Sequence, residues 1–249
     1  MIYTADLIYE IDQKLNKLSG LDHQSIQIED KLIALNNGQI KIVKKKLNPQ
    51  NVLGVGFDGN KKRYEDLEFL VEPANKHVIE GDDPQKGLIL TDPFLNKWSS
   101  DLSTLTPNYM FFVDGYLIAN KGNCKGRIIY LNSHLIKHGS VTTLLNNPSW
   151  VPSFEYQEAF CTLSSKRIEV FTDGTFTPTQ LYLSYIRYPV QMDYEGYVNS
   201  QGEDSNIVNC ELPYYMKEEL LDATVLELGI ETENPTIAQV AQLRQANDE

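Results

Sequence analysis

Two segments near the start of the chain carry the apolar spacing of amphipathic helices. Residues 7–18 form a short pattern for which Thr4 is a suitable N-cap. Residues 25–47 form a longer one, with apolar positions Ile28, Leu32, Ile33, Leu35, Ile40, Ile42, Val43 and Leu47. Charged side chains occupy the opposite side of this second helix, so its apolar face is expected to pack against another element. The pattern predicts an antiparallel helical hairpin, which needs a third element for stability.

A third helix is predicted near the end of the chain. Pro213 suits its first turn, and Gly229 lies near its end. Its apolar face consists of Met216, Leu220, Leu221, Ala223, Val225 and Leu228. We expect this helix to join the N-terminal hairpin in a bundle, and Asn234-Pro235 to open a last short helix. The predicted bundle core contains Leu32, Leu35, Ile42, Leu220 and Val225.

From Tyr109 onward the hydrophobic period changes to two, which is the spacing of β-strands. The pattern predicts a hairpin around Asp114-Gly115, strands on both sides of Asp173-Gly174, and a short helix over residues 140–146. The strands are dense in Tyr and Phe. They predict a small antiparallel sheet, folded as a sandwich or a barrel.

These elements predict an α+β protein in which a β-domain is inserted between two helical ends. Residues 1–48 and 210–249 are expected to form the bundle, and residues 109–192 the β-domain. Residues 49–108, which are rich in proline from residue 73 on, are predicted to be an irregular arm. Residues 193–209 are polar and rich in turn-forming residues, which predicts a linker.

The composition is that of a globular protein with enough material for a buried core. The chain has 249 residues, of which 41% are hydrophobic and 22% charged. The sequence displays neither a secretory signal nor an apolar run of membrane-spanning length, so we expect synthesis and retention in a cytoplasm. Cys124, Cys161 and Cys210 are odd in number and widely spaced, which predicts reduced and mostly packed thiols.

The net charge of −12 disfavours tight binding of DNA phosphates. It fits a surface past which DNA slides, and it fits ordinary solubility equally well. Within the Lys41–Lys46 run, Lys41, Lys44 and Lys45 are candidate contacts for an acidic partner or a channel. The alternative is a solvated helix end, where cations are favoured in any case.

Candidate chemistry is sparse. Gly54, Gly56 and Gly59 spell the spacing of a dinucleotide loop, but the flanking elements are wrong for one, so a surface loop is favoured. His134 and His138 are spaced as a metal pair would be on a helix; two unrelated surface imidazoles are the preferred reading. Neither a nucleophile motif nor a P-loop is found. We therefore predict no enzyme activity, no cofactor and no metal.

Aromatic side chains in the middle of the chain offer an alternative function. Exposed Tyr and Trp stack on sugars or anchor protein interfaces, whereas buried ones merely fill the core. The candidates are Trp98, Trp150, Tyr156, Tyr185 and Tyr188.

Both ends of the chain resemble structural proteins of tailed bacteriophages. The opening helix that ends in DQKLNKL, followed by a polar loop and a helix with the LNxxQ motif of residues 35–39, is similar to the start of head-to-tail adaptor proteins. The segment NCELPYYMKEELLDATVLELGIETENPT resembles the closing helix of such proteins, particularly the ring proteins of crAss-like phages. The YIRYP ending of the last strand is also similar to theirs.

The resemblance implies a non-enzymatic virion protein at the head–tail junction. Copies of the chain would form a ring, a dodecamer by analogy with portal symmetry, that binds the portal protein and neighbouring tail rings. DNA would pass through the ring without sequence-specific binding, and no membrane would be involved. The alternatives are a β-sandwich tail module that binds host glycans or another tail protein, and, less favoured, a hydrolase.

Overall fold

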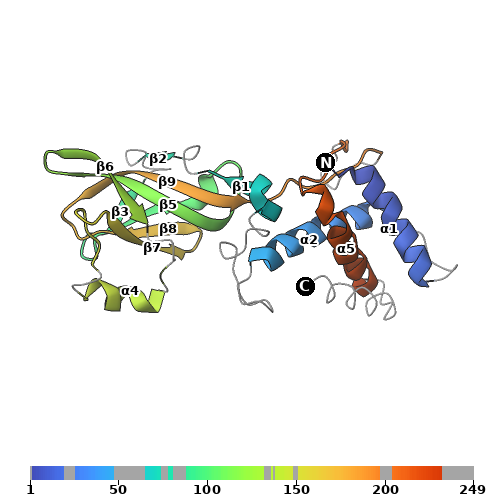
Figure 1. Ribbon diagram of the computed structural model, residues 1–249, viewed down its shortest axis with the longest axis horizontal. Coiled ribbons are helices and arrows are strands. Elements are labelled where there is room, and N and C mark those ends of the chain that lie inside the picture. Colours follow the sequence, from blue (N-terminus) through green and yellow to red (C-terminus); the bar gives the residue numbers. More distant parts are fainter. Residues whose placement is uncertain are drawn as a thin grey trace. The chain divides into compact units, whose positions relative to one another are not determined.

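The computed structural model describes residues 2–19, 26–47, 65–73, 78–80, 88–131, 136, 138–147, 151–196 and 204–231. The chain divides into two compact units. The helical unit comprises Met1–Phe69 and Pro189–Glu249, and the β unit comprises Leu70–Tyr188. The α+β class is confirmed (Figure 1).

Three of the predicted helical segments of the helical unit are helices in the structure. They are α1 (Thr4–Ser19), α2 (Ile28–Leu47) and α5 (Lys217–Glu231), the last preceded by the 3-10 turn η6 (Tyr214–Met216). Acidic residues in the first turn of α2 and lysines in its last turn complement the helix dipole. Thr4 is the first residue of α1, and its hydroxyl donates a hydrogen bond to the Val208 carbonyl, 2.7 Å away.

Residues from the two chain ends contact each other within the helical unit. Ile2 forms an antiparallel bridge with Cys210. The Asn36 side-chain amide satisfies both backbone groups of Met192, accepting from its N–H at 2.8 Å and donating to its carbonyl at 3.1 Å. Lys14 forms ion pairs of 2.8 Å with both Glu218 and Asp222. Polar contacts thus join segments that lie 156 to 208 positions apart in the sequence.

The described part of the β unit contains nine strands in a mixed sheet (Figure 1). The strands are β1 (Val71–Glu72), β2 (Val78–Glu80), β3 (Ile89–Asp92), β4 (Lys97–Asp101), β5 (Tyr109–Lys121), β6 (Cys124–Leu131), β7 (Glu158–Ser164), β8 (Arg167–Phe171) and β9 (Thr177–Arg187). Their order is β1-β9-β5-β6-β7-β8-β4-β3, and β2 also pairs with β9. The 3-10 turn η3 (Glu68–Leu70) precedes β1, η5 (Leu102–Thr104) follows β4, and the helix α4 (His138–Leu145) matches the short predicted helix.

One apolar core lies within the β unit. It is built from alternating residues of several strands, because successive side chains of a strand point to opposite faces. Its fully buried members include Leu117, Ile129, Ile168, Val170, Leu181, Leu183 and Tyr185. The Tyr185 hydroxyl donates to the Pro107 carbonyl at 2.7 Å, so the one polar atom of that side chain has a partner.

Three predictions about the strand direction and the boundaries of the β unit are wrong. The sheet is not antiparallel throughout, because β6 and β7 pair in parallel. The predicted irregular arm ends too late in the sequence, because β3 and β4 lie within residues 73–108 and continue the sheet beyond β8. The β unit accordingly begins at Leu70 and not at residue 109. Proline-rich composition indicated irregular backbone, but pairing with β8 overrides such local preferences.

Asp114-Gly115 is not a turn, although its composition is typical of one. It lies inside β5, which runs without reversal and pairs along β9, with a bulge between Phe112 and Asp114. A Cβ atom at Gly115 would lie 2.9 Å from the Tyr182 carbonyl oxygen. Glycine is therefore required here by close approach of β9 and not by chain reversal.

Strands lie on both sides of Asp173-Gly174, as predicted, because β8 ends at Phe171 and β9 begins at Thr177. The turn between β7 and β8 was not predicted. It is formed by Ser165 and Lys166, whose φ angles are 47° and 64°. Two successive left-handed residues are the signature of the hairpin turn that matches strand twist. Serine and lysine are unusual residues for it, which is why sequence composition did not indicate the turn.

Two of the three thiols are packed, as predicted. Cys161 and Cys210 are buried and Cys124 is exposed, and none forms a disulfide. Burial raises the pKa of the Cys161 thiol to about 12 and that of Cys210 to about 11, so neither is a ready nucleophile at neutral pH. Among the helices of the described residues, none has the length and apolar character to cross a membrane.

Candidate functional site

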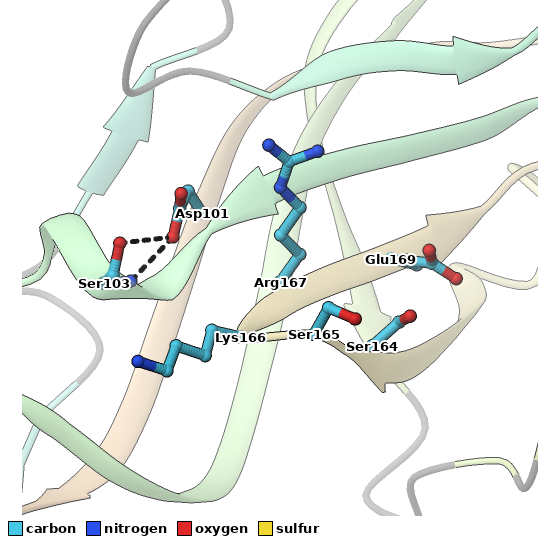
Figure 2. Close-up of a pocket in the computed structure, with 7 residues that line it drawn as sticks. All are labelled: Asp101, Ser103, Ser164, Ser165, Lys166, Arg167 and Glu169. Carbon is cyan, nitrogen blue, oxygen red and sulfur yellow. Dashed lines mark hydrogen bonds between the residues drawn. The ribbon is translucent and has the colours of Figure 1, made fainter.

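A polar pocket of about 470 Å³ lies at the end of β4 in the β unit (Figure 2). Asp101 and Ser103 form one side of it. The β7–β8 turn forms the other, and Figure 2 shows its side chains beside Asp101. The complete lining of the polar pocket is Asp101, Ser103, Ser164, Ser165, Lys166, Arg167 and Glu169.

Asp101 is held in place by the 3-10 turn that follows it. Its Oδ1 accepts hydrogen bonds from the Ser103 backbone N–H at 2.9 Å and from the Ser103 hydroxyl at 2.7 Å. These bonds are the main reason that the pKa of Asp101 lies below its usual value, and the nearby charges of Arg167 and Lys166 add to the effect. Asp101 is therefore an anchored carboxylate and not a proton donor near neutral pH.

The two cations of the polar pocket are positioned by the β7–β8 hairpin. Arg167 is the register partner of Asp101 across β4 and β8. The Lys166 carbonyl accepts a hydrogen bond from the Leu102 N–H at 2.9 Å, which fixes the turn against η5. Glu169 is paired with Lys97 at 3.3 Å. The pocket thus presents two cations, two carboxylates and hydroxyl groups, so its lining carries no net formal charge.

A second, more apolar pocket of about 440 Å³ adjoins the first one. The two share Ser103 and Lys166. We call it the tyrosine pocket, and its lining is Leu102, Ser103, Asn108, Tyr109, Met110, Lys166 and Tyr188. The Tyr109 ring packs at 5.7 Å from Tyr185, and burial raises the pKa of Tyr109 to about 12. The Tyr188 N–H donates to the Asn108 carbonyl at 3.0 Å. These contacts make the tyrosine pocket a preformed feature of the fold.

The residues proposed for the helical core lie inside the helical unit. All five have a relative exposure of at most 3%. They are Leu32, Leu35 and Ile42 on α2, and Leu220 and Val225 on α5. By contrast Ile28 and Ile33, which belong to the same predicted apolar face of α2, are 37% and 55% exposed. The apolar face of α2 is therefore wider than the surface that it buries within this unit.

The candidate lysines differ from one another. Lys41 forms an ion pair with Glu227 of α5. Lys44 is exposed and Lys45 is half-buried. Lys46, next in the run, bridges two carboxylates, with its Nζ 3.1 Å from Asp66 and 3.0 Å from Glu219. Lys44 is thus the member best placed for a partner.

The remaining sequence candidates are scattered. Tyr185 is buried, Trp98 is half-buried, and Tyr188 lines the tyrosine pocket. Tyr156 is 82% exposed. His138 lies on α4, with its Nε2 2.7 Å from the Leu163 carbonyl. The glycine loop at 54–59, Trp150, His134 and the last predicted helix lie outside the described residues.

Metal chemistry was not predicted, and the described residues contain no cluster of three His, Cys, Asp or Glu side chains suited to a metal ion. Sequence patterns missed both pockets. Lys166 and Arg167 belong to a two-residue turn that composition did not indicate, and they meet Asp101 only through the pairing of β4 with β8. Their one local signal was a pair of adjacent cations in an acidic chain. The chain matches no protein-family model and no curated protein.

Proposed function

We propose that this chain is a non-enzymatic subunit of a virion ring at the head–tail junction of a tailed phage. In this proposal α1, α2 and α5 form the bundle that binds the portal protein, and the β unit contacts neighbouring subunits or the next tail ring. A dodecamer would match the portal. The resemblance of both chain ends to phage adaptor and ring proteins motivates this function.

The observation that carries the proposal is that both ends of the chain belong to one compact unit. Ion pairs join α1 to the start of α5, among them Lys14 with Glu218 and Lys217 with Glu10. A large insertion can then extend from this unit without disturbing it. Such an arrangement suits a subunit that anchors with one part and reaches a neighbour with another.

Exposed aromatic side chains on the helical unit give the portal contact a physical basis. Tyr and other large apolar groups are favoured at protein interfaces because they remove much area from water at a low entropy cost. Among the described residues of the helical unit, the large apolar side chains that are more than half exposed are Tyr3, Tyr9, Ile33, Phe69, Ile207, Tyr214 and Tyr215. The Lys217 ammonium lies 5.8 Å from the Tyr214 ring centroid and also pairs with Glu10, so part of this surface is already ordered.

Native mass spectrometry of the purified chain, alone and mixed with the portal of the same phage, tests the proposal. We expect a ring, or a portal complex whose stoichiometry matches portal symmetry. A monomer that shows no affinity for the portal would contradict the proposal. Screens against glycans and hydrolase substrates would then examine the alternative functions.

A pair of variants separates portal binding from folding. Tyr9→Ser combined with Tyr214→Ser removes two exposed rings from the helical unit and is expected to weaken portal binding at least tenfold. Tyr130→Ser, which removes a ring of similar exposure from the β unit, is the matched control and is expected to bind normally. Equal portal binding by the unaltered chain, the double variant and Tyr130→Ser would exclude Tyr9 and Tyr214 from the portal contact.

A further inference from the structure

The β unit presents one phenylalanine almost entirely to solvent. Phe94, in the turn between β3 and β4, is 96% exposed. Leu95 beside it and Ile89 and Leu90 on β3 are each more than 40% exposed. Contiguous exposed apolar side chains on a folded protein mark interaction surfaces. We call residues 92–96 the Phe94 turn.

The Phe94 turn is held in a fixed conformation. Asp92 Oδ1 accepts hydrogen bonds from the backbone N–H groups of Phe94 at 2.9 Å and Leu95 at 3.3 Å, which is an Asx turn. Asn96 adopts a left-handed φ of 47°, and its carbonyl accepts from the Thr172 N–H at 3.2 Å and hydroxyl at 3.3 Å. A side chain fixed on an ordered turn loses little entropy when it docks.

The same unit contains a recess suited to such a side chain. The tyrosine pocket has a volume of about 440 Å³, within the range of about 300–1,000 Å³ typical of ligand pockets. Its Tyr109, Met110 and Leu102 offer aromatic and apolar contacts, and aromatic anchors in pockets of this kind dominate many interfaces. The charges of the two surfaces are also complementary, because Asp92 lies at the base of the Phe94 turn and Lys166 lines the pocket.

The turn and the pocket lie at opposite ends of β4. The strand register places Lys97, next to the Phe94 turn, against Phe171, and places Asp101, next to the pocket, against Arg167. A five-residue strand spans roughly 15 Å, so Phe94 does not fill the pocket of its own chain. Different surfaces that complement each other make a head-to-tail contact, which closes into a ring when the rotation permits.

We propose that Phe94 of one subunit inserts into the tyrosine pocket of the next copy of this chain, with Asp92 facing Lys166. The inference rests on the proposed ring and names the contact that closes it. Burial of a Phe side chain removes only about 150–250 Å² from water, less than the ~800 Å² per partner of a standard interface. The exposed Leu95 extends the contact beyond Phe94, together with either Ile89 or Leu90, since these two successive side chains point to opposite faces of β3.

Two variants in complementary positions test this contact by native mass spectrometry. Phe94→Asp destroys the inserting side chain, and Met110→Arg blocks the pocket. Each protein alone is expected to lose all species larger than a monomer. Mixed in equal amounts, they retain one intact contact, since Phe94 of the second protein meets the open pocket of the first. The mixture is therefore expected to give a heterodimer and no ring.

Two further variants and a thermal unfolding measurement distinguish loss of the contact from misfolding. Lys166→Glu, an exposed change at the pocket edge, should weaken assembly at least tenfold even if Met110→Arg proves unstable. Tyr156→Asp changes another highly exposed ring of the β unit and should assemble as the unaltered chain does. Thermal unfolding of every variant shows whether the fold is retained.

Three other outcomes would refute the Phe94 contact, and one of them would refute the ring function as well. Rings formed by Phe94→Asp would refute the Phe94 contact and leave the ring function standing. Rings that persist while portal binding is lost would assign Phe94 to the portal and refute contact between copies. If the unaltered chain forms a ring only on the portal, the same variants are compared there. A chain that stays monomeric with and without portal refutes both proposals.

Discussion

Ion pairs in the helical unit connect segments that are far apart in the sequence, whereas the β unit is built around a continuous apolar core. Lys14, Lys46 and Lys217 each pair with carboxylates on other segments of the helical unit. In the β unit, sixteen buried residues form one cluster, and described ion pairs such as that of Lys97 with Glu169 join neighbouring strands. Loss of a charge should thus lower the free energy of unfolding more in the helical unit. A methyl group added where two backbone segments pack closely should lower it more in the β unit.

The largest effect is expected from a charge placed in either core. Leu35→Asp in the helical unit and Leu117→Asp in the β unit each bury a carboxylate at a fully buried site, which should cost more than about 4 kcal/mol. Combining Leu32→Asp with Leu35→Asp should abolish folding of the helical unit. Hydrogen exchange is the measurement. Each single variant should lose amide protection mainly in its own unit; retained protection in α2 of the Leu35→Asp protein would show that Leu35 is not core.

A smaller effect, about 3 kcal/mol, is expected for Lys46→Met. Asp66 is 1% exposed, and this change leaves it and Glu219 without their shared cation. The matched change in the β unit, Lys97→Met, breaks one partly exposed ion pair and should cost about 0.5 kcal/mol. Urea unfolding of both proteins gives the two values. Equal losses would contradict the stronger dependence of the helical unit on charge.

Replacement of one glycine by alanine in each unit tests how closely other groups pack against the backbone. Gly115→Ala should cost about 2 kcal/mol, because the new methyl group would lie 2.9 Å from the Tyr182 carbonyl oxygen, on a paired strand that cannot retreat. Gly38→Ala in α2 meets the Thr224 hydroxyl at 3.1 Å, and the higher helix propensity of alanine offsets this contact by about 1 kcal/mol. Thermal unfolding should rank Gly115→Ala as the more harmful of the two, and the reverse order would refute this account.

An effect smaller than that of Gly115→Ala is expected from a change of pH. The folded β unit keeps the Cys161 thiol protonated up to about pH 12, whereas the unfolded chain releases this proton near its ordinary pKa of 9.0. The contribution of the thiol is therefore complete below pH 9 and is lost as the pH rises from 9 towards 12. About 1 kcal/mol should disappear between pH 8 and 10. Cys161→Ala should flatten this slope in urea titrations at each pH; an unchanged slope would assign it to other groups.

Helices were predictable because their signals are local. The apolar spacing of residues 28–47 and of the segment after Pro213 identified α2 and α5, and the change of period at Tyr109 indicated strands. Local composition was misleading where a residue served a tertiary contact. Asp114-Gly115 is typical of a turn, but Gly115 is a glycine because β9 passes close to it. Residues 88–101 lack strong strand signals and become strands by pairing with β8.

The α+β class, the helical segments and the acidic character therefore follow from the order of residues alone, because helix periodicity and net charge need no partner to be recognised. The pockets do not. Asp101, Lys166 and Tyr188 come from separate segments and meet through the register of β4 with β8 and of β5 with β9. The exposure of Phe94 likewise depends on an Asx turn and on hydrogen bonds from Thr172. Strand pairing joins residues at long sequence separation, and so the tertiary structure alone decided where the candidate contact surfaces lie.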